Sequence, residues 1–187
     1  MTLIYYDESG VVTAIRTGTR LSLEREHEAN ENCILIDGEV PEFPYVKDGQ
    51  VLGRPESPKL GWFSFNVEQG EWQFDLDKSR DAVWSHMKYK REKAEFSVFE
   101  WGGYTFDCNE VSQRRLQGAI QLAAIDDTIT LEWTLADNSI QAFAAAEYVQ
   151  IGVALANHVS ECHGRGRILR QEINESTTQA ELEAIVW

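Results

Sequence analysis

Short apolar segments of β-prone residues, separated by polar turn residues, fill the first part of the chain, and this pattern is typical of β-hairpins. Residues 3–6 and 11–16 are two such segments, and residues 7–10 between them are turn formers, so a hairpin is predicted. Residues 33–36 form an unbroken apolar run, which predicts a buried strand. Residues 17–32 are polar and charged, and we expect a loop there.

A second hairpin is predicted where residues 45–46 can pair with residues 51–52. Asp48-Gly49 lies between them, and this dipeptide supplies the left-handed backbone conformations of a tight hairpin turn. Pro55 and Pro58 have no N–H group and fix the backbone locally. The chain around these prolines is therefore predicted to be a linker.

A third predicted hairpin is unusually aromatic and turns at residues 68–70. Because aromatic side chains contribute large buried areas to small cores, packing of this hairpin on the following helix is the favoured interpretation. The alternative is a surface that docks a neighbouring protein, since aromatic residues are enriched at interfaces. The side chains concerned are Trp62, Phe63, Phe65, Trp72 and Phe74.

The second part of the chain changes to helical periods. Asp77 is a natural N-cap for a helix over residues 78–94. Gly102-Gly103 lies between two aromatic segments, which predicts another tight hairpin. Asp107 or Asn109 is expected to cap a further helix that ends near residue 124.

Residues 129–135 alternate strictly between apolar and polar side chains, and this is the clearest strand signal in the chain. Residues 140–143 are predicted to pair with it. A long helix is then expected over residues 144–172, and Thr178 with Glu181 forms a capping box that predicts a short last helix.

Apolar and small residues in the predicted long helix recur every four and three positions, the rhythm of a helix that packs lengthwise on another. Packing inside the same chain is the favoured interpretation, and a bundle between subunits, such as a trimer, is the alternative. Glycines in the stripe each cost about 1 kcal/mol relative to alanine. The stripe consists of Tyr148, Gly152, Leu155, Val159, Cys162, Gly166, Leu169 and Ile173.

These elements predict an α+β fold in three parts. Residues 1–54 form an N-terminal β-hairpin module, residues 55–76 a linker with the aromatic hairpin, and residues 77–187 a C-terminal helical and β domain. With 187 residues, of which 43% are hydrophobic, the chain is long enough for a substantial core.

Net charge narrows the partners that we expect. The charge of −14 argues against nucleic acid, since binding to phosphates requires clustered Lys and Arg. Cys33, Cys108 and Cys162 are odd in number and far apart, which argues against a disulfide framework and for folding in a reducing cytoplasm. The sequence shows no apolar run of membrane-spanning length and no secretion signal, so membrane insertion is not expected.

The search for catalytic chemistry gives no positive signal. His158 and Cys162 are spaced i, i+4 beside His163, but this spacing supplies at most half a zinc site. The acidic pairs at residues 75 and 77 and at residues 126 and 127 lie at predicted element ends, where capping and turns account for them. We therefore expect no enzyme activity, no catalytic residue, no cofactor and no metal site.

Residues 99–116 carry an aromatic-Gly-Gly-aromatic hairpin followed by Asp-x-Asn-x-x-Ser at a helix start. With the Lys-x-x-Arg pair upstream and the later Trp strand, Asp-Asn loop and alanine-rich helix, this order resembles a domain of unknown function seen in phage tail fibre and tail fibre assembly-like proteins. Asn109 departs from the pattern, which more often has Asp. The residues that carry the resemblance are Lys88, Arg91, Phe106, Asp107, Asn109, Ser112, Trp133, Asp137 and Asn138.

The resemblance implies a structural component of a phage tail, a baseplate or a tail-fibre attachment point, made in the host cytoplasm and located in the virion. Its partners would be other tail, baseplate or fibre proteins, or further copies of itself. One alternative is a tail fibre assembly chaperone that is absent from the mature virion. Another is a host-surface glycan-binding module, which a cleft with two carboxylates and stacked aromatics would support. The candidate interaction surface consists of Trp62, Phe63, Phe65, Trp72, Phe74, Tyr148, Leu155, Val159 and Leu169.

Overall fold

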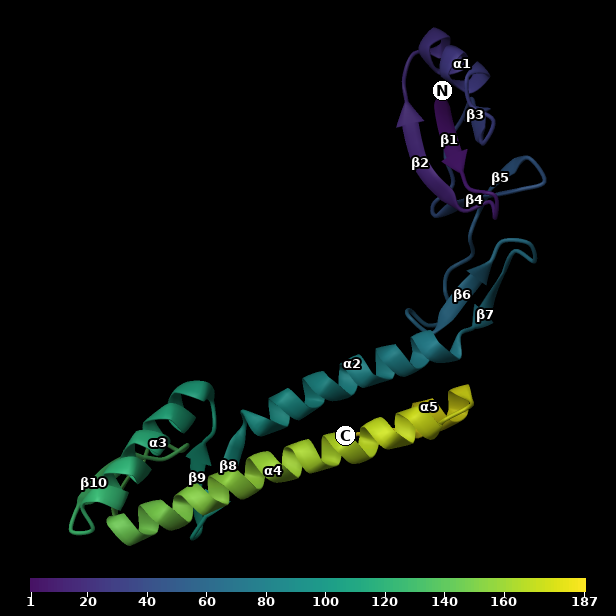
Figure 1. Ribbon diagram of the computed structural model, residues 1–187. Coiled ribbons are helices and arrows are strands. Elements are labelled where there is room, and N and C mark those ends of the chain that lie inside the picture. Colours follow the sequence, from purple (N-terminus) through teal and green to yellow (C-terminus); the bar gives the residue numbers. More distant parts are fainter. The chain divides into compact units, whose positions relative to one another are not determined.

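The computed structural model describes residues 1–187 and has mixed α+β architecture, which confirms the predicted fold class (Figure 1). It divides into two compact units, Met1–Ser79 and Arg80–Trp187, which we call the first and the second unit. The aromatic hairpin, predicted to go with a separate linker, lies in the first unit. A ring contact of 4.8 Å between Tyr45 and Phe65 joins it to the preceding hairpin.

The first unit begins with a three-stranded antiparallel sheet in the order β2-β1-β3. Its strands are β1 (Thr2–Tyr6), β2 (Val12–Thr17) and β3 (Cys33–Ile36), close to the segments that the sequence predicted. Leu3 and Ile4 are fully buried although successive strand residues point to opposite faces. Both faces of β1 are therefore covered.

Helix α1 (Arg20–Glu28) lies where the sequence analysis expected a loop, and that prediction is wrong. Its buried residue is Leu23, which packs with Leu3 and Cys33. The rest of the helix is polar, and Glu26 accepts hydrogen bonds from the Tyr5 hydroxyl and from Arg16. A nine-residue helix held by one leucine and by polar contacts leaves almost no periodic signal in the sequence.

Two more hairpins complete the first unit. Strands β4 (Pro44–Lys47) and β5 (Gln50–Gly53) pair in the predicted register, and their turn residues Asp48 and Gly49 have φ of +51° and +74°. Both left-handed values agree with the Asp-Gly turn chemistry. Strands β6 (Phe63–Asn66) and β7 (Glu71–Phe74) form the aromatic hairpin.

Helix α2 (Leu76–Glu95) starts slightly earlier than predicted and has a different cap. Asp75 Oδ1 accepts a hydrogen bond from the backbone N–H of Lys78 at 3.1 Å, so Asp75 occupies the capping position. Asp77 lies inside the first turn, and its prediction as the N-cap is wrong. Both aspartates are suitable N-cap residues, so the sequence alone does not show which of them caps the helix. The first helical residue, Leu76, decides in favour of Asp75.

The remaining elements of the second unit follow the predicted order. The Gly-Gly hairpin is confirmed, since both glycines have positive φ. Asn109 caps α3 by accepting hydrogen bonds from two backbone N–H groups, and Thr178 and Glu181 form the predicted capping box. The elements are β8 (Val98–Trp101), β9 (Tyr104–Asp107), α3 (Glu110–Ile125), β10 (Thr130–Thr134), β11 (Ile140–Ala144), α4 (Ala145–Glu175) and α5 (Gln179–Ala184).

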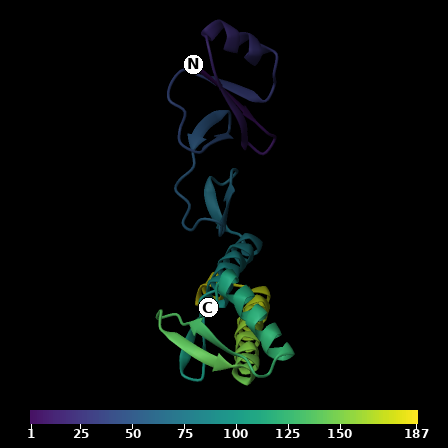
Figure 2. The same ribbon diagram turned by 90° about the vertical axis from the view of Figure 1, so that its left-hand side faces the viewer.

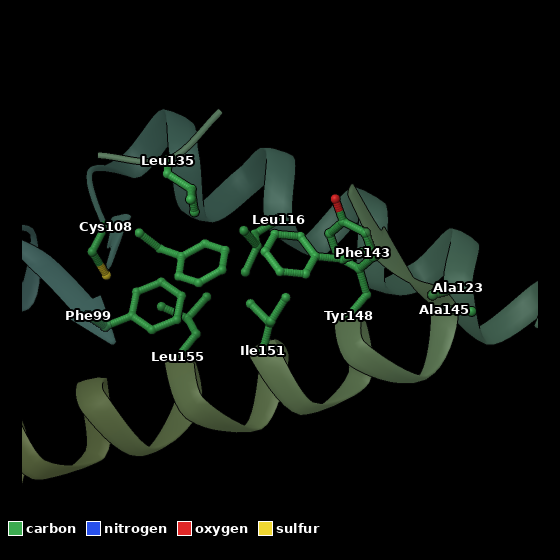
Figure 3. Close-up of a cluster of buried hydrophobic side chains, with 11 residues drawn as sticks. Phe99, Cys108, Leu116, Ala123, Leu135, Phe143, Ala145, Tyr148, Ile151 and Leu155 are labelled. Carbon is green, nitrogen blue, oxygen red and sulfur yellow. The ribbon is translucent and has the colours of Figure 1, made fainter. Parts of the chain in front are cut away.

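Aromatic rings and aliphatic side chains from α3, α4 and the two hairpins form the main core of the second unit (Figure 3). Phe143 lies at its centre, with ring contacts of 5.6 Å to Phe106 and 6.0 Å to Tyr148. Gly152 lets α3 approach α4, because a β-carbon there would lie 2.8 Å from Ile120 Cδ1. The first half of the α4 stripe therefore packs inside the chain.

Candidate partner-docking surface

The aromatic hairpin arranges its rings in cross-strand pairs. Phe65 pairs with Trp72 across β6 and β7, with ring centroids 5.2 Å apart and planes at 69°. Tyr45 contacts the other side of Phe65 in a second edge-to-face arrangement. Such pairs add about 0.5–1.5 kcal/mol beyond the burial of area, so the three rings form a stiff row.

A pocket of 360 Å³ opens at the Trp72 end of this row. The Trp72 indole N–H donates a hydrogen bond to the Pro55 carbonyl oxygen at 2.8 Å, which fixes the ring beside the proline-rich segment. Four of the seven side chains that line the pocket are apolar. The residues that line the pocket are Phe43, Arg54, Pro55, Glu56, Ser57, Leu60 and Trp72.

Two apolar residues on this pocket are presented to solvent. Leu60 is 93% exposed and Phe43 is 69% exposed. Phe43 has φ of +50°, a left-handed conformation that is strained for a bulky side chain. Strain of this kind persists where the surrounding structure imposes it, and here it accompanies the display of an aromatic ring.

Arg54 is the basic residue of the pocket. Its guanidinium carbon lies 5.1 Å from the centroid of the Phe65 ring, a cation–π contact. Its Nε atom is buried without a hydrogen-bond partner. We call the pocket with its two exposed apolar residues the docking pocket.

The predicted aromatic residues divide between surface and core. Phe63, Phe65, Trp72 and Phe74 are half-buried, and Trp72 alone of them lines the docking pocket. Trp62 is buried, and the Ser79 hydroxyl donates to its carbonyl oxygen at 3.0 Å. Trp62 therefore belongs to the core, in agreement with the favoured interpretation that the aromatic hairpin packs within the chain.

The α4 residues of the predicted surface pack within the second unit. Tyr148 and Leu155 are buried in its main core, and Leu169 is also buried. Val159 is half-buried and packs against the same core. This burial agrees with the favoured interpretation of the heptad-like spacing, packing inside the chain, and a contact of these residues with a partner stays a prediction.

Sequence reasoning missed Phe43, Arg54 and Leu60. These residues lie outside every periodic segment, where an isolated apolar residue in a polar stretch carries no pattern. The sequence offered one local indication that these apolar side chains lie in loops and not in the core. Phe43 lies between Glu42 and a proline, and Leu60 follows the proline-containing segment.

The acidic pairs act at element ends. A hydrogen bond from the Ser64 hydroxyl lowers the pKa of Asp75, and one from the Thr128 hydroxyl lowers the pKa of Asp126. A carboxyl group that serves as a general acid near neutral pH needs a raised pKa instead. Both carboxylates are therefore suited to capping and turns.

The histidine and cysteine cluster of α4 contacts the end of α2. His158 Nε2 lies 3.2 Å from the Ala94 carbonyl oxygen, and His163 Nε2 lies 3.2 Å from Glu95 Oε2. Burial raises the pKa of the Cys162 thiol, which disfavours the thiolate that a metal requires. The structure contains no group of three or more His, Cys, Asp or Glu side chains that could hold a metal ion.

An open cleft of 660 Å³ lies elsewhere on the first unit, where three hairpin turns meet. Exposed carboxylates of Glu8, Asp48 and Glu68 line it together with Tyr6 and Phe65. Carboxylates accept hydrogen bonds from hydroxyl groups, and aromatic rings can pack on sugar rings, so this lining is suited to hydroxyl-rich ligands. We call this cleft the turn cleft.

The fold and these surfaces describe a two-unit α+β protein with a candidate docking pocket on its first unit. Residues 78–186 match the model of a family described as a domain of unknown function (DUF4376). This match covers more than half of the chain, and the chain belongs to that family. No curated protein and no solved structure matches the chain. None of the helices has the length and apolar character that crossing a membrane requires.

Proposed function

We propose that this chain is a structural component of a bacteriophage tail, in the baseplate or where a tail fibre attaches, and that it acts through protein–protein contacts. The motif order of its second half, which resembles a domain of phage tail proteins, supports the biological setting. The docking pocket supports the mode of action. No catalytic step is part of the proposal.

The observation that carries the proposal is the display of Phe43 and Leu60 beside an apolar pocket. Complete burial of a Leu or Phe side chain contributes about 1.5–3 kcal/mol. A pocket rimmed by two such side chains is an anchor of the kind that dominates binding energy at interfaces. A neighbouring tail protein that covers them would relieve their exposure.

Quantitative mass spectrometry of gradient-purified particles tests the proposal. We expect the chain at a fixed ratio to a known tail protein. Absence from particles together with abundance in the infected lysate would refute a virion role and favour the assembly chaperone.

A pair of matched variants tests the docking pocket itself. Leu60→Asp is expected to lower the ratio of the chain to the known tail protein in particles, because it places a charge in the apolar contact. Ile125→Asp is the control, since Ile125 is 83% exposed on α3 in the second unit. Circular dichroism should show both variants folded. Equal incorporation of the two variants would remove the docking pocket from the proposal.

The turn cleft favours one second candidate, a glycan-binding module on the host surface. Tyr6 offers a half-buried ring at the cleft, and three carboxylates offer hydrogen-bond acceptors. Calorimetric titration of host surface polysaccharide against the wild type and against Asp48→Asn with Glu68→Gln tests this function. Absence of heat with the wild type would reject it.

A further inference from the structure

Helices α2 and α4 lie side by side in the second unit (Figure 2). Basic side chains from both helices gather at the seam between them. Trp84, Lys88 and Arg91 are spaced i, i+4 and i+7 on α2, which places them on one face. Arg170 on α4 has its guanidinium carbon 5.1 Å from the Trp84 ring centroid, and Lys88 Nζ lies 6.0 Å from the same centroid. We call Lys88, Arg91 and Arg170 the basic seam.

Arg91 reaches α4 because position 166 is a glycine. A β-carbon there would lie 3.2 Å from Arg91 Cδ and 3.9 Å from Arg91 Cγ. The aliphatic stem of Arg91 therefore packs directly on the α4 backbone. Arg170 follows Gly166 by one helical turn, so the Arg91 and Arg170 guanidinium groups lie in the same neighbourhood of the seam.

These cations have no anionic partner within the chain. Lys88, Arg91 and Arg170 form no ion pair, and Arg91 Nε and Arg170 Nη1 are buried without a hydrogen-bond acceptor. Glu95, one turn beyond Arg91, is paired with His163 instead. A buried N–H of a charged group without an acceptor is unfavourable. These two buried atoms are closed to an external ligand, so an acceptor from outside would contact the other guanidinium N–H groups of Arg91 and Arg170, which form no hydrogen bond within the chain.

Arg80 shows how an arginine of the same helix pair looks when it is structural. Its Nη2 atom donates to the carbonyl oxygens of Asn174 at 2.9 Å and Ser176 at 2.7 Å. Arg80 thereby ties α2 to the end of α4. Arg80 Nε is also buried and donates no hydrogen bond, so the difference lies at the guanidinium tip, where Arg91 and Arg170 make no comparable hydrogen bond.

We propose that the basic seam binds carboxylate side chains of an acidic peptide segment on a partner protein. The planar guanidinium group matches a carboxylate with two parallel hydrogen bonds. From Trp84 to Arg91 helix α2 rises about 10 Å at roughly 1.5 Å per residue. An extended peptide advances about 3.3 Å per residue, so about three residues of an acidic segment span this length.

The charge of the chain favours a short acidic segment over a long polyanion. The net charge of −14 repels nucleic acid at long range, whereas three local cations attract a few carboxylates at contact distance. The inference rests on the geometry of the second unit and is independent of a virion role.

The test is fluorescence anisotropy of a labelled decaglutamate peptide with the full chain at an ionic strength of about 0.15 M, where a Debye length of about 8 Å screens the long-range repulsion by the net charge of the chain. Arg91→Met with Arg170→Met is expected to weaken binding at least about tenfold. Arg114→Met with Arg115→Met is the matched control, since it removes the same charge from exposed positions of α3. The control should stay within about twofold of the wild type, as expected for the loss of surface charges.

Three outcomes would overturn the proposal. One is absence of decaglutamate binding to the wild type, and another is equal weakening in both double variants, which would indicate unspecific electrostatics. The third is binding of a single-stranded oligonucleotide that Arg91→Met with Arg170→Met weakens, without any binding of decaglutamate. This result would identify phosphate groups, and not carboxylates, as the ligand of the basic seam.

A melting experiment keeps the inference testable if the double variant folds poorly. Arg91→Met alone should leave the melting temperature of the free protein unchanged or raise it, because it removes an unpaired charge. Decaglutamate should raise the melting temperature of the wild type and not that of Arg91→Met. A fall of several degrees for Arg91→Met in the free protein would assign Arg91 to packing and overturn its role in binding.

Discussion

Two glycine-to-alanine substitutions in neighbouring helices should change stability in opposite directions. Gly118 lies in α3, and a β-carbon there would meet nothing within 4 Å. Gly152 lies in α4, and a β-carbon there would lie 2.8 Å from Cδ1 and 3.3 Å from Cγ1 of Ile120. Both substitutions add one methyl group to a helical glycine. The difference between their effects on the free energy of unfolding therefore reports the packing of α3 on α4.

The magnitudes follow from two opposing effects. Alanine in a helix interior is about 1 kcal/mol more favourable than glycine, so Gly118→Ala should raise the free energy of unfolding by about 1 kcal/mol. Gly152→Ala gains the same amount but overpacks the contact with Ile120, and overpacking typically costs about 1–3 kcal/mol. We expect a net loss of up to about 2 kcal/mol for Gly152→Ala.

Chemical denaturation followed by circular dichroism at 222 nm measures both changes. Ile120→Val removes the Cδ1 atom, and alone it should cost about 0.5–1.5 kcal/mol. Combined with Gly152→Ala it should cost less than the sum of the two single changes, since it relieves the close contact. Equal stabilisation by Gly118→Ala and Gly152→Ala, or strict additivity in the double variant, would refute the claim that Gly152 exists to admit Ile120.

Three further expectations concern caps, protons and thiols. Asn109→Ala should lower the free energy of unfolding by about 1 kcal/mol, because two N–H groups of α3 lose their acceptor, and Asn109→Asp should largely preserve it. The pKa values of Asp75 and Asp126 are lowered in the folded protein, so both ionised carboxylates contribute stability at a pH above their unfolded pKa near 4. This contribution is lost as the pH falls below that value. In melting temperatures measured against pH, Asp75→Asn with Asp126→Asn should therefore show a smaller decrease at acidic pH than the wild type. Burial raises the pKa of Cys108 and Cys162, so a thiol reagent at neutral pH should label them slowly in the folded protein and quickly in denaturant; rapid labelling of the folded protein would contradict their burial.

Sequence periodicity predicted the elements whose stability comes from a regular buried face. The strand around Trp133 and the long helix from Ala145 alternate or repeat so regularly that their positions needed no tertiary information. The α1 helix escaped because Leu23 is its buried residue, and its other contacts are polar ones to distant residues. Elements held by non-local polar contacts leave no local record in the chain.

The docking pocket shows a second limit of sequence reasoning. Trp72 was predicted because aromatic residues alternate in its hairpin, whereas Phe43 and Leu60 occupy irregular segments that only the fold brings to one pocket. Conversely, Tyr148 and Leu155 lie in a regularly spaced stripe, and both belong to the core of the second unit, as the favoured interpretation of that spacing predicted. Regularity indicates burial inside the chain more reliably than it indicates contact with a partner.

The two glycines of the α4 stripe point to different tasks for the two halves of that helix. Gly152 admits the apolar end of Ile120 from α3, in the half where aromatic and aliphatic side chains close a core (Figure 3). Gly166 admits Arg91 from α2, in the half where charged side chains remain without acceptors. A glycine costs about 1 kcal/mol of helix stability relative to alanine in both places. In the first half the close approach gives packing within the fold, whereas in the second half it brings Arg91 beside α4 without an acceptor for its Nε atom. The search for a partner of the second unit therefore belongs at the α2–α4 seam.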